Sequence, residues 1–145
     1  MADRLPTSPF VALGVLRIVS GLLFLQHGTM KFLSFPEGQM AGTGWSFAGA
    51  GAYAGLIELV GGVLLILGLF TRSAAFVASG TMAVAYWYAH APQGLYPINN
   101  GGELAALYCF VFLYIFVAGP GAWSLDGVLK RQRREQRAAD AAARE

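Results

Sequence analysis

Four long apolar segments, separated by short polar connections, dominate the pattern of hydrophobic and polar positions along the chain. They run from about Phe10 to Met30, from Ala48 to Phe70, from Ser73 to Ala91 and from Glu103 to Gly119. A helix needs about 20 mostly apolar residues to cross the hydrocarbon core of a bilayer, so each segment is close to a full span. Glycines recur in them at helical spacing, which favours helices over the strands of a closed barrel. The pattern predicts an all-α, polytopic membrane protein with a bundle of four transmembrane helices.

Composition supports a membrane protein, because charges are scarce where the apolar segments lie. The chain has 145 residues, of which 56% are hydrophobic and 12% charged, whereas a soluble domain carries about 25% charged residues. Only six charges lie between positions 5 and 125: Arg17, Lys31, Glu37, Glu58, Arg72 and Glu103. Six charges cannot cover the surface of a soluble domain of this length, and so much apolar sequence excludes a disordered chain.

The distribution of basic residues predicts the orientation of the bundle. Arg72 lies in the short second connection, and the basic cluster 130–134 follows the last apolar segment directly. The third connection, residues 92–102, has no lysine or arginine. By the positive-inside rule, both termini are predicted to be cytoplasmic, while the loops around 35–45 and 96–102 face outward. The basic cluster is therefore expected to contact anionic lipid headgroups and not nucleic acid.

The chain divides into two parts. Residues 1–126 hold the four predicted helices, and residues 127–145 form a basic cytoplasmic tail. The tail is expected to be helical, either extending from the last span or lying on the membrane surface. Because Arg17 interrupts the first apolar segment, that segment is expected to stay as an anchor and not to be removed as a signal peptide.

Two charges fall deep within predicted helices, each on a face of small residues. Gly14, Gly21 and Gly28 recur every seven residues in the first helix, with Arg17 on the same stripe. The second helix has one face formed by Gly51, Gly55, Glu58 and Gly62. Small residues let helices approach closely in lipid, and an unpaired charge there costs at least about 2.5–3.5 kcal/mol. We predict a buried Arg17–Glu58 ion pair, which either fixes the helix register or binds an anionic or redox ligand.

A second polar group is predicted at the outer membrane boundary. His27 and Lys31 lie one turn apart near the end of the first helix, Tyr86 and His90 lie near the end of the third, and Glu103 begins the fourth. Quinone carbonyls accept hydrogen bonds from histidine or lysine, and histidine exchanges protons near neutral pH. The cluster therefore fits a quinone site or a proton relay. The alternative is that these side chains cap helix ends and contact headgroups within the usual aromatic belt.

Metal and thiol chemistry have weaker support. Two histidines and Glu103, on three helices, could hold a metal, but no HxxxH or CxxC spacing occurs, so no metal site is predicted. Cys109 lies inside an apolar run, where it is expected to be a packing residue. The sequence has no motif for a self-sufficient catalytic centre.

Four sequence stretches are specific in combination: RIVSGLLFLQHGTMKF, GLIELVGGVLLILGLFTR, PINNGGELAALY and GPGAWSLD. In this order they resemble the DoxX family of small bacterial inner-membrane proteins, over about residues 11–126. The positions that match the family pattern are Arg17, His27, Gly28, Lys31, Glu58, Gly61, Gly62, Arg72, Asn100, Gly101, Glu103, Gly119, Gly121 and Asp126. The resemblance implies a four-helix membrane bundle associated with redox systems. Similar proteins are linked to a thiosulfate:quinone oxidoreductase and to a membrane complex that joins superoxide detoxification with thiol homeostasis.

Three functions follow from the residues and the resemblance. The first is an integral inner-membrane subunit of a redox complex, which interacts with quinone or supports a protein partner in oxidative-stress defence or thiosulfate oxidation. The second is a non-catalytic scaffold that recruits a soluble oxidoreductase through its loops or its basic tail. The third is a small-solute carrier, which would need a homo-oligomer to form a central cavity.

Overall fold

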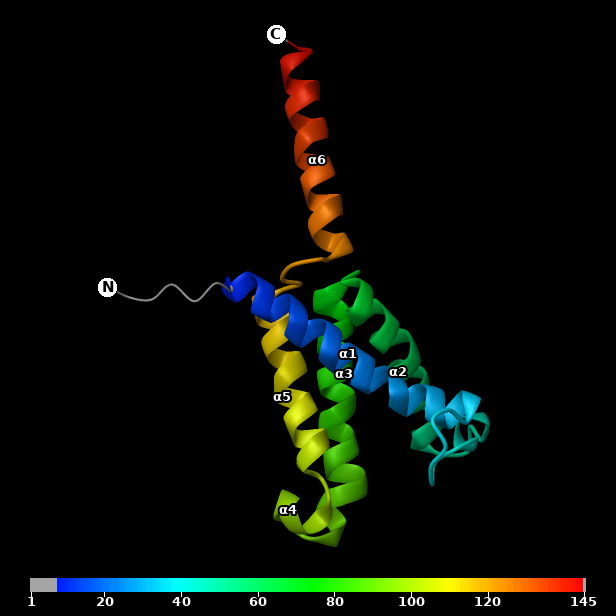
Figure 1. Cartoon of the computed structure of the whole chain (residues 1–145). Coiled ribbons are helices and arrows are strands. Elements are labelled where there is room, and N and C mark those ends of the chain that lie inside the picture. Colours follow the sequence, from blue (N-terminus) through cyan, green and yellow to red (C-terminus); the bar gives the residue numbers. More distant parts are fainter. Residues whose placement is uncertain (1–7, 145) are drawn as a thin grey trace, which may run out of the picture.

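The computed structural model of the chain describes residues 8–144 (Figure 1). These residues form helices joined by short loops and include no strand, which confirms the all-α prediction. The bundle is built from α1 (Pro9–Leu33), α2 (Ala50–Leu67), α3 (Thr71–Ala85) and α5 (Glu103–Ala118). The connections and the tail contain η1 (Thr43–Trp45), η2 (Tyr86–His90), η3 (Ala91–Gln93), α4 (Pro97–Asn100) and α6 (Leu125–Ala142).

The bundle helices correspond to the four apolar segments of the sequence. α1 has 25 residues and α2 has 18, and both are long and apolar enough to cross a bilayer. α5 is apolar but has 16 residues, and α3 has 15 residues before it continues as the π-helical turn η2. Within residues 8–144, length and composition therefore identify two candidate spans, and the crossing of α3 and α5 stays a prediction.

The bundle consists of two helix pairs, α1 with α2 and α3 with α5, and α2 also contacts α3. The pairs lie together where α1 begins and diverge toward the opposite end (Figure 1). We call the end where α1 begins and α5 finishes the tail end, because α6 follows from it, and the opposite end the loop end. Phe24, Leu65, Phe112 and Ile115 are fully buried in the core between the pairs.

Glycines on α1 and α2 let these two helices pack closely, as the glycine stripes predict. A Cβ atom added at Gly28 would lie 2.6 Å from the backbone nitrogen of Leu59, and one at Gly62 would lie 2.8 Å from the Cβ of Leu25. Gly21 is similarly close to Leu65. Because no side chain larger than hydrogen fits between the backbones at these positions, the glycines set the distance between α1 and α2.

Large apolar side chains cover the outside of the bundle as well as its core. The exposed fractions of Phe76, Phe110 and Val117 are 59%, 69% and 66%. Water-soluble monomers rarely expose large contiguous apolar surfaces. An outer surface of this kind fits a bundle surrounded by lipid.

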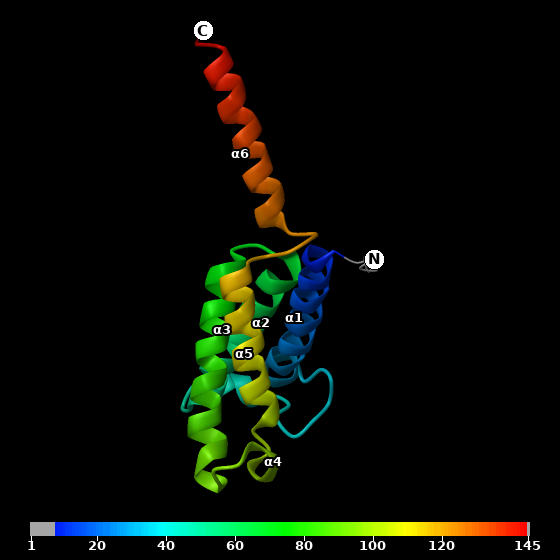
Figure 2. The same ribbon diagram turned by 90° about the vertical axis from the view of Figure 1, so that its left-hand side faces the viewer.

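The tail after α5 turns sharply and then forms a separate helix. Gly119 and Gly121 adopt positive φ angles of 98° and 66°, which only glycine adopts readily. The Ser124 side chain accepts a hydrogen bond from the backbone N–H of Gly127 and so caps α6. α6 has no buried residue and projects away from the bundle (Figure 2). The predicted helical tail is therefore present as a helix that contacts the bundle through its first turns and stands clear of it beyond them.

Candidate functional site

Arg17 is fully buried at the tail end, and it binds backbone carbonyls instead of an acidic side chain. Its Nε donates to the carbonyl of Pro120 at 2.7 Å. Its two terminal nitrogens donate to the carbonyl oxygens of Leu65, Ile66, Ala122 and Trp123. The last carbonyls of a helix have no partner within the helix and carry partial negative charge. The carbonyl oxygens at the C-terminal end of α2 and in the segment after α5 therefore supply the negative charge that a carboxylate would otherwise supply.

Glu58 is also buried, but its partner is Lys31. The Lys31 Nζ lies 2.6 Å and 2.8 Å from the two carboxylate oxygens of Glu58, and the exposed fractions of the two residues are 6% and 4%. The predicted Arg17–Glu58 pair is therefore wrong. Arg17 and Lys31 are 14 residues apart, about 21 Å along α1 at 1.5 Å per residue. The buried ion pair therefore lies toward the loop end of α1 and not at the tail end, where Arg17 lies.

The surroundings of the Lys31–Glu58 pair are apolar and tightly packed. A Cβ at Gly55 would lie 2.8 Å from the Cδ of Lys31, so the lysine stem lies directly on the α2 backbone. Phe32 packs beside it, with the Trp45 ring in an edge-to-face contact at 5.3 Å. In these apolar surroundings few other polar groups can compensate either charge. Each charge therefore depends on the other for its stabilisation.

His27 lies one turn before Lys31, and its ring contacts α5 of the other helix pair. Its ring is edge-on to that of Tyr108, with 6.4 Å between ring centroids. Tyr108 is buried and stacks on Phe112 at 5.5 Å. We call His27, Lys31, Glu58 and Tyr108 together the inter-pair site: Lys31 joins Glu58 within the α1–α2 pair, and His27 meets Tyr108 between the pairs. Our sequence reasoning missed Tyr108, although it ends the conspicuous stretch PINNGGELAALY.

Tyr86 and His90 form a different group at the loop end of α3. The Nδ1 atom of His90 lies 3.0 Å from the carbonyl oxygen of Asn100, and the Tyr86 and His90 rings stack with centroids 6.5 Å apart. The Tyr86 hydroxyl donates to the carbonyl of Leu95 at 2.9 Å. These contacts hold the connection between α3 and α5 in place.

The five residues predicted as one outer cluster therefore separate into groups. His27 and Lys31 belong to the inter-pair site, and Tyr86 and His90 hold the α3–α5 connection. Glu103 is exposed at the start of α5, where an acid offsets the helix dipole. Among residues 8–144 no group of three or more His, Cys, Asp or Glu side chains could hold a metal ion.

Two further charged side chains tie helix ends together at the tail end. The Asp126 carboxylate accepts hydrogen bonds from the backbone N–H groups of Phe70 and Thr71, at 2.9 Å and 2.8 Å, and so caps the start of α3. Arg72 donates to the carbonyls of Phe116 and Val117 near the end of α5. Each charge matches the dipole of the helix end that it binds.

Two family models match the sequence of this bundle. The model described as DoxX matches residues 12–91, and the model described as TQO small subunit DoxD matches residues 52–141. The chain belongs to the DoxX family. The matched residues include Arg17, Lys31 and Glu58, which are the most deeply buried charges of the structure.

Relatives of this DoxX-family chain are found in bacteria. An uncharacterised protein of Haemophilus influenzae is 51% identical over 117 residues, covering 79% of this chain and 87% of the relative. An uncharacterised membrane protein of Mycobacterium tuberculosis is 30% identical over 135 residues, covering 81% of this chain and 80% of the relative. No solved structure matches the chain. Family and relatives together make this a membrane protein.

Proposed function

We propose that this protein is an inner-membrane subunit of a redox complex and that it binds quinone at the inter-pair site. The match to the small subunit DoxD supports a role beside an oxidoreductase partner. The observation that carries the assignment of the site is the Lys31–Glu58 pair, buried between two apolar helices. Ionisable groups within membrane-spanning helices are costly, and they usually mark a pathway or a binding site.

The inter-pair site has the side chains that quinone chemistry needs. Reduction of a quinone to a quinol takes two electrons and two protons; the partner oxidoreductase would supply the electrons. His27 is suited to proton transfer because an imidazole can both donate and accept a proton. The Tyr108 hydroxyl and the Lys31 ammonium can donate hydrogen bonds to quinone carbonyl oxygens. Tyr108 and Phe112, whose rings stack, would contact the quinone ring beside His27.

Substitution of the two histidines tests this proposal. His27→Gln should leave the amount of protein unchanged but lower quinone-linked respiration, measured in membranes that carry matched amounts of each variant. His90→Gln is the matched control, because glutamine can still donate to the Asn100 carbonyl and His90 lies outside the inter-pair site. Quinone extracted from the purified protein should decrease in His27→Gln only.

Wild-type respiration and wild-type quinone content in His27→Gln would refute the quinone site. A scaffold that recruits a soluble oxidoreductase is the second candidate, and the projecting α6 favours it. Removal of residues 130–145 would then release the partner from the membrane while the bundle stays folded.

A further inference from the structure

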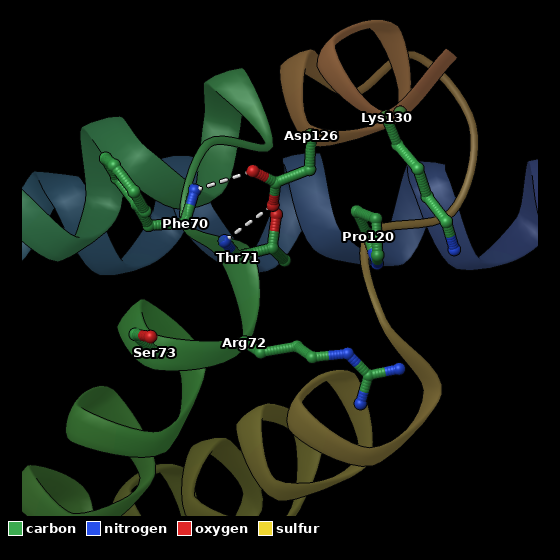
Figure 3. A pocket seen from close by; sticks show the side chains of 8 residues that line it. Phe70, Thr71, Arg72, Ser73, Pro120, Asp126 and Lys130 are labelled. Carbon is green, nitrogen blue, oxygen red and sulfur yellow. Dashed lines mark hydrogen bonds between the residues drawn. The ribbon is translucent and has the colours of Figure 1, made fainter. Parts of the chain in front are cut away.

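A cavity of about 310 Å³ opens at the tail end, far from the inter-pair site. It lies between the start of α3, the segment after α5 and the first turns of α6 (Figure 3). Thr71, Arg72 and Ser73 line it from α3, and Asp126 and Lys130 line it from α6. The proposed quinone chemistry does not use this cavity.

Two cationic side chains, those of Arg72 and Lys130, line the cavity and have hydrogen-bond donors that no residue in the range 8–144 uses. Arg72 is fixed by the two bonds from its Nη1 to the carbonyls of Phe116 and Val117, and within residues 8–144 neither Nε nor Nη2 has a hydrogen-bond partner. Lys130 forms no ion pair with any other described residue. A guanidinium held in place loses little side-chain entropy when it binds a further oxygen, which suits it to a phosphate.

The acid in the cavity is already engaged. Both carboxylate oxygens of Asp126 accept backbone N–H groups at the start of α3, and the dipole of α3 offsets its charge. With Arg72 and Lys130 positive and Asp126 negative, the lining keeps one net positive charge. The cavity as a whole therefore attracts anions.

A buried hydroxyl at the same place lacks a partner. Thr71 is fully buried, and its Oγ1 forms no hydrogen bond with any residue in the range 8–144. A buried polar group without a partner is rare, because losing its hydrogen bond to water costs free energy. An oxygen-rich ligand in the cavity would offer an acceptor to this hydroxyl directly or through a bound water.

We propose that this cavity binds the phosphate of an anionic lipid headgroup. It lies at the ends of the apolar helices, which is headgroup level for a bundle in a bilayer. Phe70, 66% exposed, lines it, and aromatic side chains are enriched at membrane interfaces. Clusters of lysine and arginine next to membrane helices attract anionic lipids, and here a fixed cavity gives that attraction a defined site.

The test uses the purified full-length protein in a neutral detergent. Native mass spectrometry counts the molecules of dioleoyl phosphatidylglycerol that stay bound, with dioleoyl phosphatidylcholine as the comparison lipid of the same chain length. Lys130→Gln should lower retention of phosphatidylglycerol about tenfold, which is the loss of one hydrogen bond to a charged group. Arg134→Gln is the matched control, because it removes the same charge one helical turn further along α6, outside the cavity.

Thr71→Val and inorganic phosphate complete the experiment. Thr71→Val should lower lipid retention but not the thermal unfolding temperature of the lipid-free protein, because the hydroxyl has no hydrogen bond to lose. Equal losses in Lys130→Gln and Arg134→Gln, equal retention of both lipids, or full retention by Thr71→Val would overturn the proposal. Binding of inorganic phosphate without retention of phosphatidylglycerol would overturn the lipid assignment in favour of a free phosphate.

Discussion

Two basic side chains of α1 are buried, and they find different kinds of partner. Arg17 spreads its charge over five backbone carbonyls, whereas Lys31 meets a single carboxylate. The difference follows from the chemistry of the two side chains. A guanidinium has five donors in a planar fork, which can bind several carbonyls at once, while an ammonium is a compact charge.

The Lys31–Glu58 pair leads to a prediction on stability. Glu58→Gln leaves the Lys31 ammonium buried without a counter-charge, which should cost about 3–5 kcal/mol of the free energy of unfolding. The double variant Lys31→Met with Glu58→Met removes both charges and should be more stable than Glu58→Gln. Thermal unfolding of the purified proteins, with the amount in membranes as a second measure, compares the two variants.

The double variant also separates structure from function. If the pair only holds α1 against α2, the double variant should keep both its abundance and its quinone-linked activity. The quinone proposal expects abundance to recover and activity to stay low. A double variant less stable than Glu58→Gln would contradict the pairing itself.

The sequence indicates which charges are buried but not how they pair. Arg17, Lys31 and Glu58 are recognisable because each lies in or next to an apolar run. The acceptors of Arg17 are backbone carbonyls, however, and any residue can provide those, so no side chain at positions 65, 66 or 120–123 reveals them. From the sequence alone Glu58 is therefore the expected partner of Arg17, whereas in the structure Glu58 pairs with Lys31.

At the scale of elements, the glycines of α1 can be tested against a glycine that packs on nothing. Gly28→Ala should lower the stability, because its Cβ would lie 2.6 Å from the Leu59 backbone and force α1 and α2 apart. Gly80→Ala is the control: it lies within α3 with nothing within 4 Å of the added Cβ. It should raise the stability by up to about 1 kcal/mol through helix propensity.

Thermal unfolding in detergent measures both glycine variants. A Gly28→Ala protein as stable as Gly80→Ala would show that the α1–α2 contact is loose enough to adjust. The sequence predicts these contacts well because small residues at helical spacing have few other uses in membrane helices. It does not predict the π-helical turn at residues 86–90, since His90 and Asn100 hold the chain there through a contact between separate elements.

For the whole molecule, the arrangement of the helices shows which segments lie at the same end of the bundle. α1 begins and α5 finishes at the same end, where the backbone N–H of Ala122 donates to the carbonyl of Phe10 at 3.0 Å. Asn99 lies at the opposite end, in the exposed connection before α5. If all four bundle helices cross the membrane, the two ends of the bundle lie on opposite sides.

A labelling experiment checks the predicted orientation. In a Cys109→Ser background, Asn99→Cys should react with a membrane-impermeant thiol reagent added to intact cells, because residues 96–102 are predicted to face outward. A reporter fused after Arg137 should be active only if it is a type that works in the cytoplasm. Protection of Asn99→Cys, together with labelling of a cysteine at Gln136, would reverse the assignment.

The five carbonyl contacts of Arg17 also set an order for biosynthesis. The residues that accept its hydrogen bonds are made late: Leu65 follows Arg17 by 48 residues and Trp123 by 106. At about 5–20 residues per second, the ribosome needs about 5–20 s to reach the last of them. Until residues 120–123 are made, the guanidinium of the first helix has at most the carbonyls of Leu65 and Ile66 among its final acceptors. A nascent chain that stops at residue 119 would have all four bundle helices but only two of the five carbonyls that hold Arg17.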